Sequence, residues 1–303
     1  MPATAQRAVV DSVVGAIETV GDAWSWLVLS EAIIDGTTRF DSFQSRLEIA
    51  RSTLSARLSS LCANGLMKRD KRAYLLTEKG ADFFACIMTA MAWADRSNTN
   101  GQAPWHAAHI GCAELIHAEL RCAACHELVH ARHVSFNRRP RPATALPGAL
   151  QRRRAPSLDL LQRVRPDSTA ATLQVLGDRW SVLLIRECFF GSHRFDEFQQ
   201  SLGIASNILS DRLRRLAELG ILARTAYQQR PLRHEYRLTE KGLALYPVPL
   251  AMLAWGDRWV FDGRPPVRLT HKTCGRRLTP VLSCSACTNP ITRSDIVFDA
   301  IQK

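Results

Sequence analysis

The pentapeptide Leu76-Thr77-Glu78-Lys79-Gly80 returns unchanged as Leu238-Thr239-Glu240-Lys241-Gly242. Three stretches before it repeat in the same order. They are Gly21-Asp22-Ala23-Trp24-Ser25 with Gly177-Asp178-Arg179-Trp180-Ser181, Arg39-Phe40-Asp41-Ser42-Phe43-Gln44 with Arg194-Phe195-Asp196-Glu197-Phe198-Gln199, and Leu54-Ser55-Ala56-Arg57-Leu58 with Leu209-Ser210-Asp211-Arg212-Leu213. An ordered series of this kind indicates an internal duplication, so we expect two domains of one kind.

The pattern of apolar residues predicts helices and then a hairpin within each copy. In the second copy, residues 168–189 have apolar positions at helical spacing, and a short helix should begin near Phe195. Leu209, Leu213 and Leu216 form one apolar stripe on a helix that Gly220 ends. Residues 221–226 and 234–238 read as two short strands around a basic loop. This order predicts a winged helix-turn-helix.

The whole chain is therefore expected to be mainly α-helical, with small β-hairpin wings and two tandem winged helix-turn-helix domains. Each domain should be followed by a small zinc-ribbon segment. The expected boundaries are 8–98 for the first domain, 99–136 for its His/Cys segment, 137–163 for an Arg/Pro-rich linker, 164–262 for the second domain and 263–303 for the second His/Cys segment. The second copy is seven residues longer than the first, just before Tyr236.

On these residues the sequence resembles the HxlR-type winged-helix regulators, which are bacterial DNA-binding proteins that act as dimers. The resemblance rests on the repeated stretches above and on Tyr236-Arg237-Leu238-Thr239-Glu240-Lys241-Gly242. It implies a transcription regulator whose tandem copies imitate a homodimer within one chain. Some members of the family sense oxidants through a cysteine about thirteen residues before the tryptophan. Asp11 and Asp167 stand there, which puts that thiol switch in doubt.

In a winged helix, the second helix of the helix-turn-helix enters the major groove and the wing reaches the DNA backbone. The side chains opposite the buried stripe are therefore the candidate base readers, and the wing supplies phosphate contacts. For the second copy the candidates are Ser206, Asn207, Ser210, Asp211, Arg214 and Arg215 on the helix, and Gln229, Arg230, Arg233 and His234 on the wing. Arg57 and Arg212 lie beside the buried stripe, so we expect a structural ion pair or a phosphate contact there.

The first copy is poorer in long side chains on the same helix face. Its candidates are Ser52, Thr53, Ser55 and Ser59, with Lys68, Arg69, Lys71 and Arg72 on a shorter wing. We therefore expect the second copy to dominate sequence readout. The first copy should mainly support docking.

A cluster of one histidine and three cysteines follows each domain. His109, Cys112, Cys122 and Cys125 match His271, Cys274, Cys284 and Cys287 in spacing. One imidazole and three thiolates suit a tetrahedral structural Zn²⁺, so we expect one zinc ribbon after each winged helix. Reversible thiol chemistry and simple packing are the alternatives, and further histidines at 106, 117, 126, 130 and 133 leave the fourth ligand of the first cluster open. Cys62, Cys86 and Cys188 stand in apolar helical contexts and are expected in the core.

Composition agrees with a globular protein that meets an anionic partner. The chain has 303 residues, 46% of them hydrophobic, and a formal net charge of +12. Most of the positive excess lies in 99–167 and 263–303, so charge alone supports DNA binding only weakly. Asp11, Glu18 and Asp22 interrupt the apolar start of the chain, and we expect neither a secretion signal nor a membrane span. A cytoplasmic location follows.

Double-stranded DNA is thus the expected partner, and self-association and a small-molecule effector remain open. A second interpretation is an interaction or sensing module in which the first copy has lost DNA binding and takes a protein or small ligand. A zinc- or thiol-responsive regulator is a further alternative. The chain lacks a phosphate-binding Gly-rich loop, a Gly-x-Ser-x-Gly elbow and a His-Glu-x-x-His site, so we do not expect an enzyme.

Overall fold

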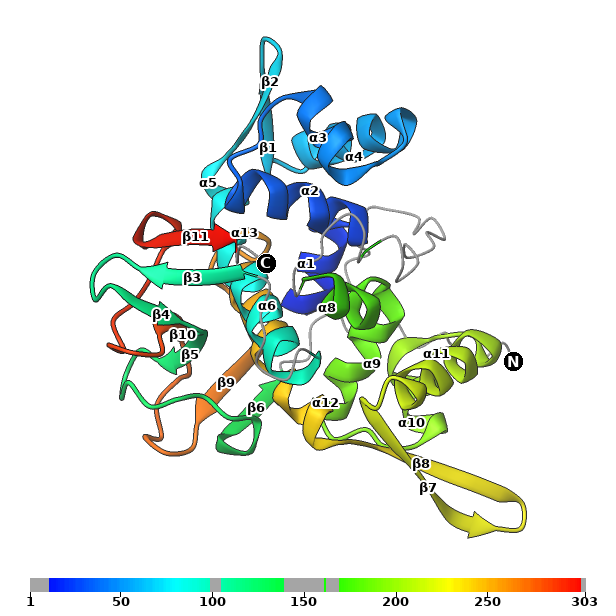
Figure 1. Ribbon diagram of the computed structural model, residues 1–303. Helices are drawn as coiled ribbons and strands as arrows, with labels where there is room; N and C mark the ends of the chain where they lie inside the picture. Colours follow the sequence, from blue (N-terminus) through cyan, green and yellow to red (C-terminus); the bar gives the residue numbers. More distant parts are fainter. Residues whose placement is uncertain (1–10, 99–104, 139–160, 162–168, 301–303) are drawn as a thin grey trace.

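The computed structural model describes residues 11–98, 105–138, 161 and 169–300. Each copy forms the expected winged helix-turn-helix (Figure 1). The first copy comprises α1 (Ser12–Val20), α2 (Ala23–Ile34), α3 (Phe40–Leu47), α4 (Arg51–Ala63), β1 (Met67–Asp70), β2 (Ala73–Leu76), α5 (Glu78–Ala81) and α6 (Phe84–Asn98). The second comprises α8 (Thr169–Leu176), α9 (Arg179–Phe189), α10 (Phe195–Leu202), α11 (Ser206–Glu218), β7 (Leu222–Gln229), β8 (Leu232–Leu238), α12 (Glu240–Ala244) and α13 (Pro247–Trp259). Among the described helices, none is both long and apolar enough to cross a membrane.

The repeated residues have local structural roles that explain their recurrence. Asp22 caps α2, and Asp178 caps α9 by accepting hydrogen bonds from Trp180 N and Ser181 N at 3.0 and 3.2 Å. The same two carboxylates pair with the helix-turn-helix arginines, Asp22 with Arg57 at 2.6 Å and Asp178 with Arg212 at 3.0 Å. The expectation of structural ion pairs at these arginines is confirmed. Each pair fixes the second helix of the motif to the helix that the aspartate caps.

The unchanged pentapeptide ties the wing to the helix after it. Thr77 and Thr239 cap α5 and α12, each accepting a hydrogen bond from the glycine that ends the pentapeptide at 3.1 Å. A Cβ atom on Gly80 would lie 2.0 Å from the carbonyl oxygen of Leu66, and one on Gly242 would lie 2.3 Å from that of Ile221. No other residue fits this approach without moving backbone.

The two copies pack together as a pseudo-dimer through their first and last helices. Helix α1 packs on α13, and α6 packs on α8 and α13. Trp93 Nε1 donates to the carbonyl oxygen of Lys241 at 3.0 Å, and the equivalent Trp255 Nε1 donates to that of Lys79 at 3.0 Å. One buried apolar cluster runs through both copies. The matched pair of hydrogen bonds shows an approximate two-fold relation between the copies.

The segments that follow the two domains join into one β-module. The first supplies β3 (Trp105–His109), β4 (Glu114–Ile116), β5 (Ala118–Cys122), η1 (Ala131–His133) and β6 (Val134–Arg138), and the second supplies β9 (Val267–His271), β10 (Pro280–Cys284), η2 (Arg293–Asp295) and β11 (Ile296–Ala300). Strand β5 pairs antiparallel with β10, β3 with β11, and β6 with β9. In the β5–β10 pair Leu120 faces Leu282, which is its own equivalent in the other copy. The pseudo-two-fold axis therefore passes through this pair.

This exchange corrects the expected division into separate segments 99–136 and 263–303. Within the residues the structure describes, all three sheets of the module, β11-β3-β4, β10-β5 and β6-β9, combine strands from both copies. The expected linker also begins later, because Asn137 and Arg138 end β6 and pair with Arg268 and Val267. Most of the rest of that linker, including the arginines at 152–154, and Asp167 lie outside the described residues.

Candidate DNA interface and metal sites

Helix α11 presents a polar face opposite its buried stripe, as predicted. Leu209, Leu213 and Leu216 are completely buried. The outward residues that are exposed to solvent are Ser206, Asn207, Ser210 and Arg214. Short and long hydrogen-bonding groups therefore stand on a helix of suitable length for the major groove.

The long charged groups on this face are already paired with one another. Arg214 contacts Asp211 at 2.7 Å and Glu218 at 3.4 Å, and Asp211 also bonds Arg212. The hydrogen bond from Arg214 lowers the pKa of the Asp211 carboxyl. Such exposed pairs contribute little to stability because water screens them, so Arg214 can leave them at small cost.

Two of the predicted contacts in the second copy are engaged inside the domain. Arg215 is half-buried and donates from Nη2 to the carbonyl oxygen of Gln174 at 3.0 Å. His234 lies 3.0 Å from Arg224 across the wing. By contrast Gln229, Arg230 and Arg233 are exposed at the wing tip, where a DNA backbone would pass.

The first copy also exposes its helix face and wing. Ser52, Ser55 and Ser59 on α4 and Lys68, Arg69, Lys71 and Arg72 on the wing are exposed, and Thr53 is half-buried. Helix α4 contains no acidic residue, unlike α11. Figure 1 shows the two wings at opposite ends of the molecule, and α4 and α11 on the side away from the β-module. The pseudo-dimer thus offers two separate reading helices.

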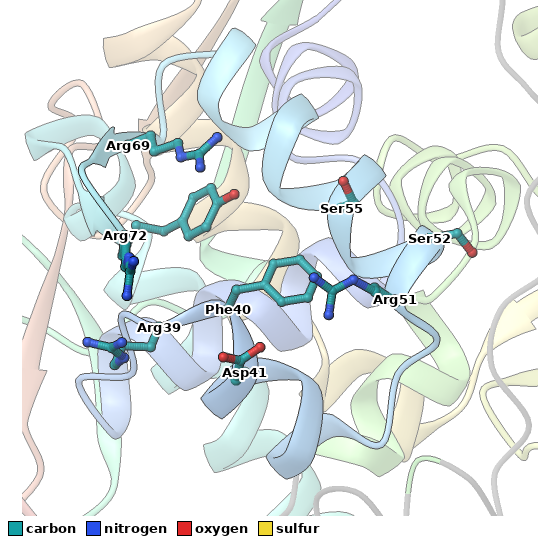
Figure 2. A pocket seen from close by; sticks show the side chains of 9 residues that line it. Arg39, Phe40, Asp41, Arg51, Ser52, Ser55, Arg69 and Arg72 are labelled. Atoms are coloured by element: carbon teal, nitrogen blue, oxygen red, sulfur yellow. The ribbon is translucent and has the colours of Figure 1, made fainter.

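A cavity of about 940 Å³ lies between α3, α4 and the wing of the first copy (Figure 2). It is lined by Arg39, Phe40, Asp41, Arg51, Ser52, Ser55, Arg69, Arg72 and Tyr74. Ser52, Ser55, Arg69 and Arg72 were predicted from the sequence as DNA contacts. The remaining lining residues, Arg39, Phe40, Asp41, Arg51 and Tyr74, were not predicted. They come from three separate segments, and only the fold brings them together.

The eight predicted metal ligands do come together, but in a different grouping. One site joins His109 and Cys112 of the first copy to Cys284 and Cys287 of the second. The other joins Cys122 and Cys125 to His271 and Cys274. The expectation of one ribbon per copy is therefore wrong: each site takes His-x2-Cys from one copy and Cys-x2-Cys from the other. We call these the composite sites.

The distances in the composite sites fit a tetrahedral ion. Cys112 Sγ and Cys284 Sγ lie 3.8 Å apart, and Nδ1 of His109 lies 3.3 Å from the sulfurs of Cys112 and Cys287. In the other site Nδ1 of His271 lies 3.3 Å from Cys125 Sγ and 3.6 Å from Cys274 Sγ. Zinc–sulfur bonds of about 2.3 Å at tetrahedral angles separate two sulfurs by about 3.8 Å. The donors therefore match in kind, number and spacing, and each group could hold a metal ion.

In each composite site the pKa of one cysteine is lowered and that of another, Cys112 or Cys125, is raised. The backbone N–H groups of Ala286 and Cys287 donate to Cys284 Sγ at 3.3 and 3.4 Å. A hydrogen bond from the backbone of Asn289 lowers the pKa of the Cys287 thiol, and one from Arg276 lowers that of Cys274. Of the described residues, neither group includes the histidines at 117, 126, 130 and 133.

The remaining cysteines lie in or beside the core. Cys86 and Cys188 are buried, and burial raises both of their pKa values, that of Cys188 to about 12. Cys62 is half-buried. Asp11, at the position of the family's sensing cysteine, caps α1 and pairs with the buried Arg186 at 2.8 Å. The first copy therefore has a structural carboxylate at that position.

The architecture defines a tandem winged helix-turn-helix protein with exposed reading helices. The sequence model of the HxlR-like helix-turn-helix family matches residues 19–102 and 175–263, more than half of the chain. The chain belongs to this family, and it is a transcriptional regulator with tandem domains.

Known relatives are of about the size of one copy. The uncharacterized HTH-type transcriptional regulator MT3179 of Mycobacterium tuberculosis is 41% identical over 139 residues, which are 46% of this chain and 88% of the relative. The reduced form of the transcriptional regulator YodB from B. subtilis is 34% identical and covers 30% of this chain and 90% of its own, with a TM-score of 0.27. The redox regulator HypR in its reduced form is 38% identical and covers 30% of this chain and 94% of its own, with a TM-score of 0.28.

Proposed function

We propose that this regulator acts in the cytoplasm on double-stranded DNA, with its two winged helices docked on two half-sites. The observation that carries the proposal is the pseudo-two-fold packing, which presents α4 and α11 as separate exposed helices of one chain. A dimeric helix-turn-helix protein reads a site whose symmetry mirrors its own. Because the two helices differ in sequence, the preferred site is only partly palindromic.

The second copy dominates sequence readout in this proposal. Asn207 and Arg214 are exposed on α11, and these residue types bond adenine and guanine edges in a bidentate manner. The exposed wing residues Gln229, Arg230 and Arg233 contact phosphates. On α4 the exposed short hydroxyls of Ser52, Ser55 and Ser59 offer less discrimination.

In vitro selection of DNA sites, followed by binding assays with the full chain, tests this division. Arg214→Ala should lower the ratio of specific to non-specific affinity by about tenfold, since a bidentate base contact is worth about 1–3 kcal/mol. The matched change Ser59→Ala on α4 should leave that ratio nearly unchanged. Equal losses would show that the copies share the readout, and the absence of any selected sequence would exclude a sequence-specific regulator.

We further propose that the metal of the composite sites is Zn²⁺ in a structural role. Thiolate and imidazole are its usual structural ligands, and all four positions are filled by side chains of the protein. The ion would supply a cross-link between the copies, and it would leave no open position for catalysis.

Pairs of cysteine substitutions distinguish the composite sites from one ribbon per copy. Cys112→Ser with Cys284→Ser should remove one of two ions, because both residues serve the same composite site. Cys112→Ser with Cys122→Ser should remove both ions, although these residues lie in one segment. The ribbon grouping predicts the opposite result, and Cys62→Ser serves as a control that keeps both ions. Metal analysis gives the count, and thiolate charge-transfer bands after cobalt substitution give a second measurement.

A further inference from the structure

The cavity in the first copy gathers positive charge that pairs with no carboxylate among the described residues. Arg39, Arg51, Arg69 and Arg72 line it, and Asp41 is the only acidic residue among the lining residues. In the part of the chain that the structure describes, no carboxylate oxygen lies within 4.0 Å of these four guanidinium groups. In Figure 2 their side chains surround the hollow from the wing, the start of α3 and the start of α4. The cavity is therefore a local attractor for an anion.

Aromatic rings form part of the same wall. The guanidinium carbon of Arg51 lies 5.0 Å from the ring centroid of Phe40, and that of Arg69 lies 5.9 Å from that of Tyr74. Both rings are half-buried, so each has a fixed place and an accessible surface. The hydroxyls of Ser52 and Ser55 add hydrogen-bonding groups on the α4 side. A hollow with flat apolar surfaces and a few directed polar groups is typical of small-ligand sites, and its volume lies in their usual range of about 300–1,000 Å³.

The second copy provides an internal comparison, because the duplication places an equivalent residue at each position. Ser206 stands where the first copy has Arg51, and Glu235 stands where it has Ala73. Glu235 pairs with Arg237 at 3.0 Å, and Arg194, the equivalent of Arg39, is stacked on Tyr227 at 4.6 Å. The second copy therefore lacks the cation of Arg51 and has a carboxylate on the strand that bridges Arg194, although it keeps an arginine, Arg224, at the position of Arg69. Arg51 is therefore a feature of the first copy alone, which fits a role that the two copies do not share.

We propose that this cavity binds a small organic anion that carries a planar ring together with a carboxylate or phosphate group. Arg51 and Arg69 hold the anionic group, because guanidinium forms paired hydrogen bonds with carboxylate and phosphate. Phe40 and Tyr74 contact the flat apolar part. Ser52 and Ser55 fix its orientation.

Binding has a regulatory consequence that rests on the proposed function. Ser52, Ser55, Arg69 and Arg72 line the cavity and are also candidate DNA contacts of the first copy. An anion in the cavity occupies these groups and adds negative charge where a phosphate backbone would lie. The ligand and DNA therefore compete, and the first copy is the sensor of the pair.

Titration of the full-length protein with 2-naphthoate, a fluorescent planar carboxylate, tests the site without DNA. We expect saturable binding with a dissociation constant of about 1 mM or lower. Arg51→Ser, which installs the residue of the second copy, should weaken it by about tenfold or more, as expected for loss of a charged hydrogen bond. Arg214→Ser, at an exposed arginine outside the cavity, is the matched control and should bind like the wild type. All of the variants change exposed residues, and circular dichroism confirms their fold.

Three results would overturn the proposal. The first is no saturable binding of 2-naphthoate, or equal binding by the Arg51→Ser variant. The second is equal binding of the neutral analogue 2-naphthamide, which would remove the role of charge. The third is inorganic phosphate binding as tightly as 2-naphthoate, because a site that reads only the anion fits a DNA backbone phosphate instead.

Competition is measured separately, with the selected DNA site. 2-Naphthoate should weaken DNA binding by the wild type in step with occupancy of the cavity, and should have little effect on Arg51→Ser at the same concentrations. Unchanged DNA affinity at a saturated cavity would exclude the regulatory role. If the protein selects no DNA sequence, the proposed function fails while the ligand titration still decides the site.

Discussion

The two reading helices of this chain differ in how their charges are satisfied. On α11 the long charged residues bond one another, as Arg214 does with Asp211 and Glu218. On α4 there are no acids, and the arginines around its start face a hollow. Because one sequence was duplicated to make both, the difference arose by divergence on a common scaffold. Surface charge has changed, whereas the capping aspartates and the wing glycines have not.

The buried ion pairs of the two copies have also diverged, but in each copy an arginine still pairs with the buried carboxylate. Glu31 and Glu187 are equivalent buried carboxylates, yet the first is paired with Arg46 on α3 and the second with Arg186 on α9. The cation has moved from one helix to another, and in the second copy it also reaches Asp11 across the pseudo-dimer. A buried carboxylate needs a partner, but several positions can supply one.

The largest expected difference between the copies concerns these two arginines. Arg186→Met should lower the free energy of unfolding by about 3–5 kcal/mol, because it removes the buried cation that bridges Asp11 and Glu187. Arg46→Met removes a side chain that is 46% exposed and should cost only about 1 kcal/mol. Urea denaturation measures both. Similar losses of stability in the two variants would mean that Glu31 and Glu187 depend equally on their arginine partners.

A pH effect is expected at Asp257, on the α13 side of the α1–α13 contact. Burial raises its pKa from 3.8 to about 6, although the hydroxyl of Ser12 donates to it. Since the folded pKa lies above the unfolded one, the stability it provides is present below about pH 4 and is lost as pH rises through about 6. Relative to Asp257→Asn, the wild type should lose up to about 3 kcal/mol over that interval. Asp262→Asn, at an exposed position, should follow the wild type, and a constant difference for Asp257→Asn would contradict the assignment.

The salt dependence of DNA binding shows whether each wing contacts the DNA backbone. Arg233→Ala in the second copy and Arg72→Ala in the first should each reduce the slope of log affinity against log salt by about 1, if each contacts one phosphate. Fluorescence anisotropy at several salt concentrations gives the slope. A change for Arg233 alone would show that only the longer wing touches the backbone.

The smallest effect should be the same in both copies. Trp93→Phe and Trp255→Phe each remove one hydrogen bond between the copies, at 3.0 Å in both cases, and each should cost about 1 kcal/mol. Thermal or urea unfolding of the two variants checks this equality. A clear inequality would show that the two-fold relation does not extend to the energetics of the interface.

The features that could be predicted from the sequence are those that depend on residues close together in the chain. The Leu209, Leu213 and Leu216 stripe and the strands of the wing follow from local spacing, and both are found. An ion pair at Arg212 was one of two expected roles, but its partner Asp178 could not be predicted. The grouping of the metal ligands could not be predicted. Duplication repeats the spacing in both copies, so pairing within a copy and between copies satisfy the same pattern. Only the strand exchange of β5 with β10 decides between them.

The cavity escaped prediction for a different reason. Arg39, Arg51 and Tyr74 belong to three segments, and exposed arginines on separate elements carry no periodic signal. A binding role for them can be inferred only from their placement around one cavity and from the comparison with Ser206 and Glu235 in the second copy. The repeat could have directed attention to them, because Arg51 and Ser206 differ within otherwise matching stretches.

The composite sites also bear on how the chain is made. Cys112 and Cys284 are separated by 172 positions, and they must meet before the site that they share can form. On the ribosome, the first winged helix therefore emerges with its His-x2-Cys ligands exposed, and they stay so until nearly all of the second copy has been synthesised. Under the proposed role of the composite sites, metal binding would come late in synthesis, because each site needs ligands from both copies.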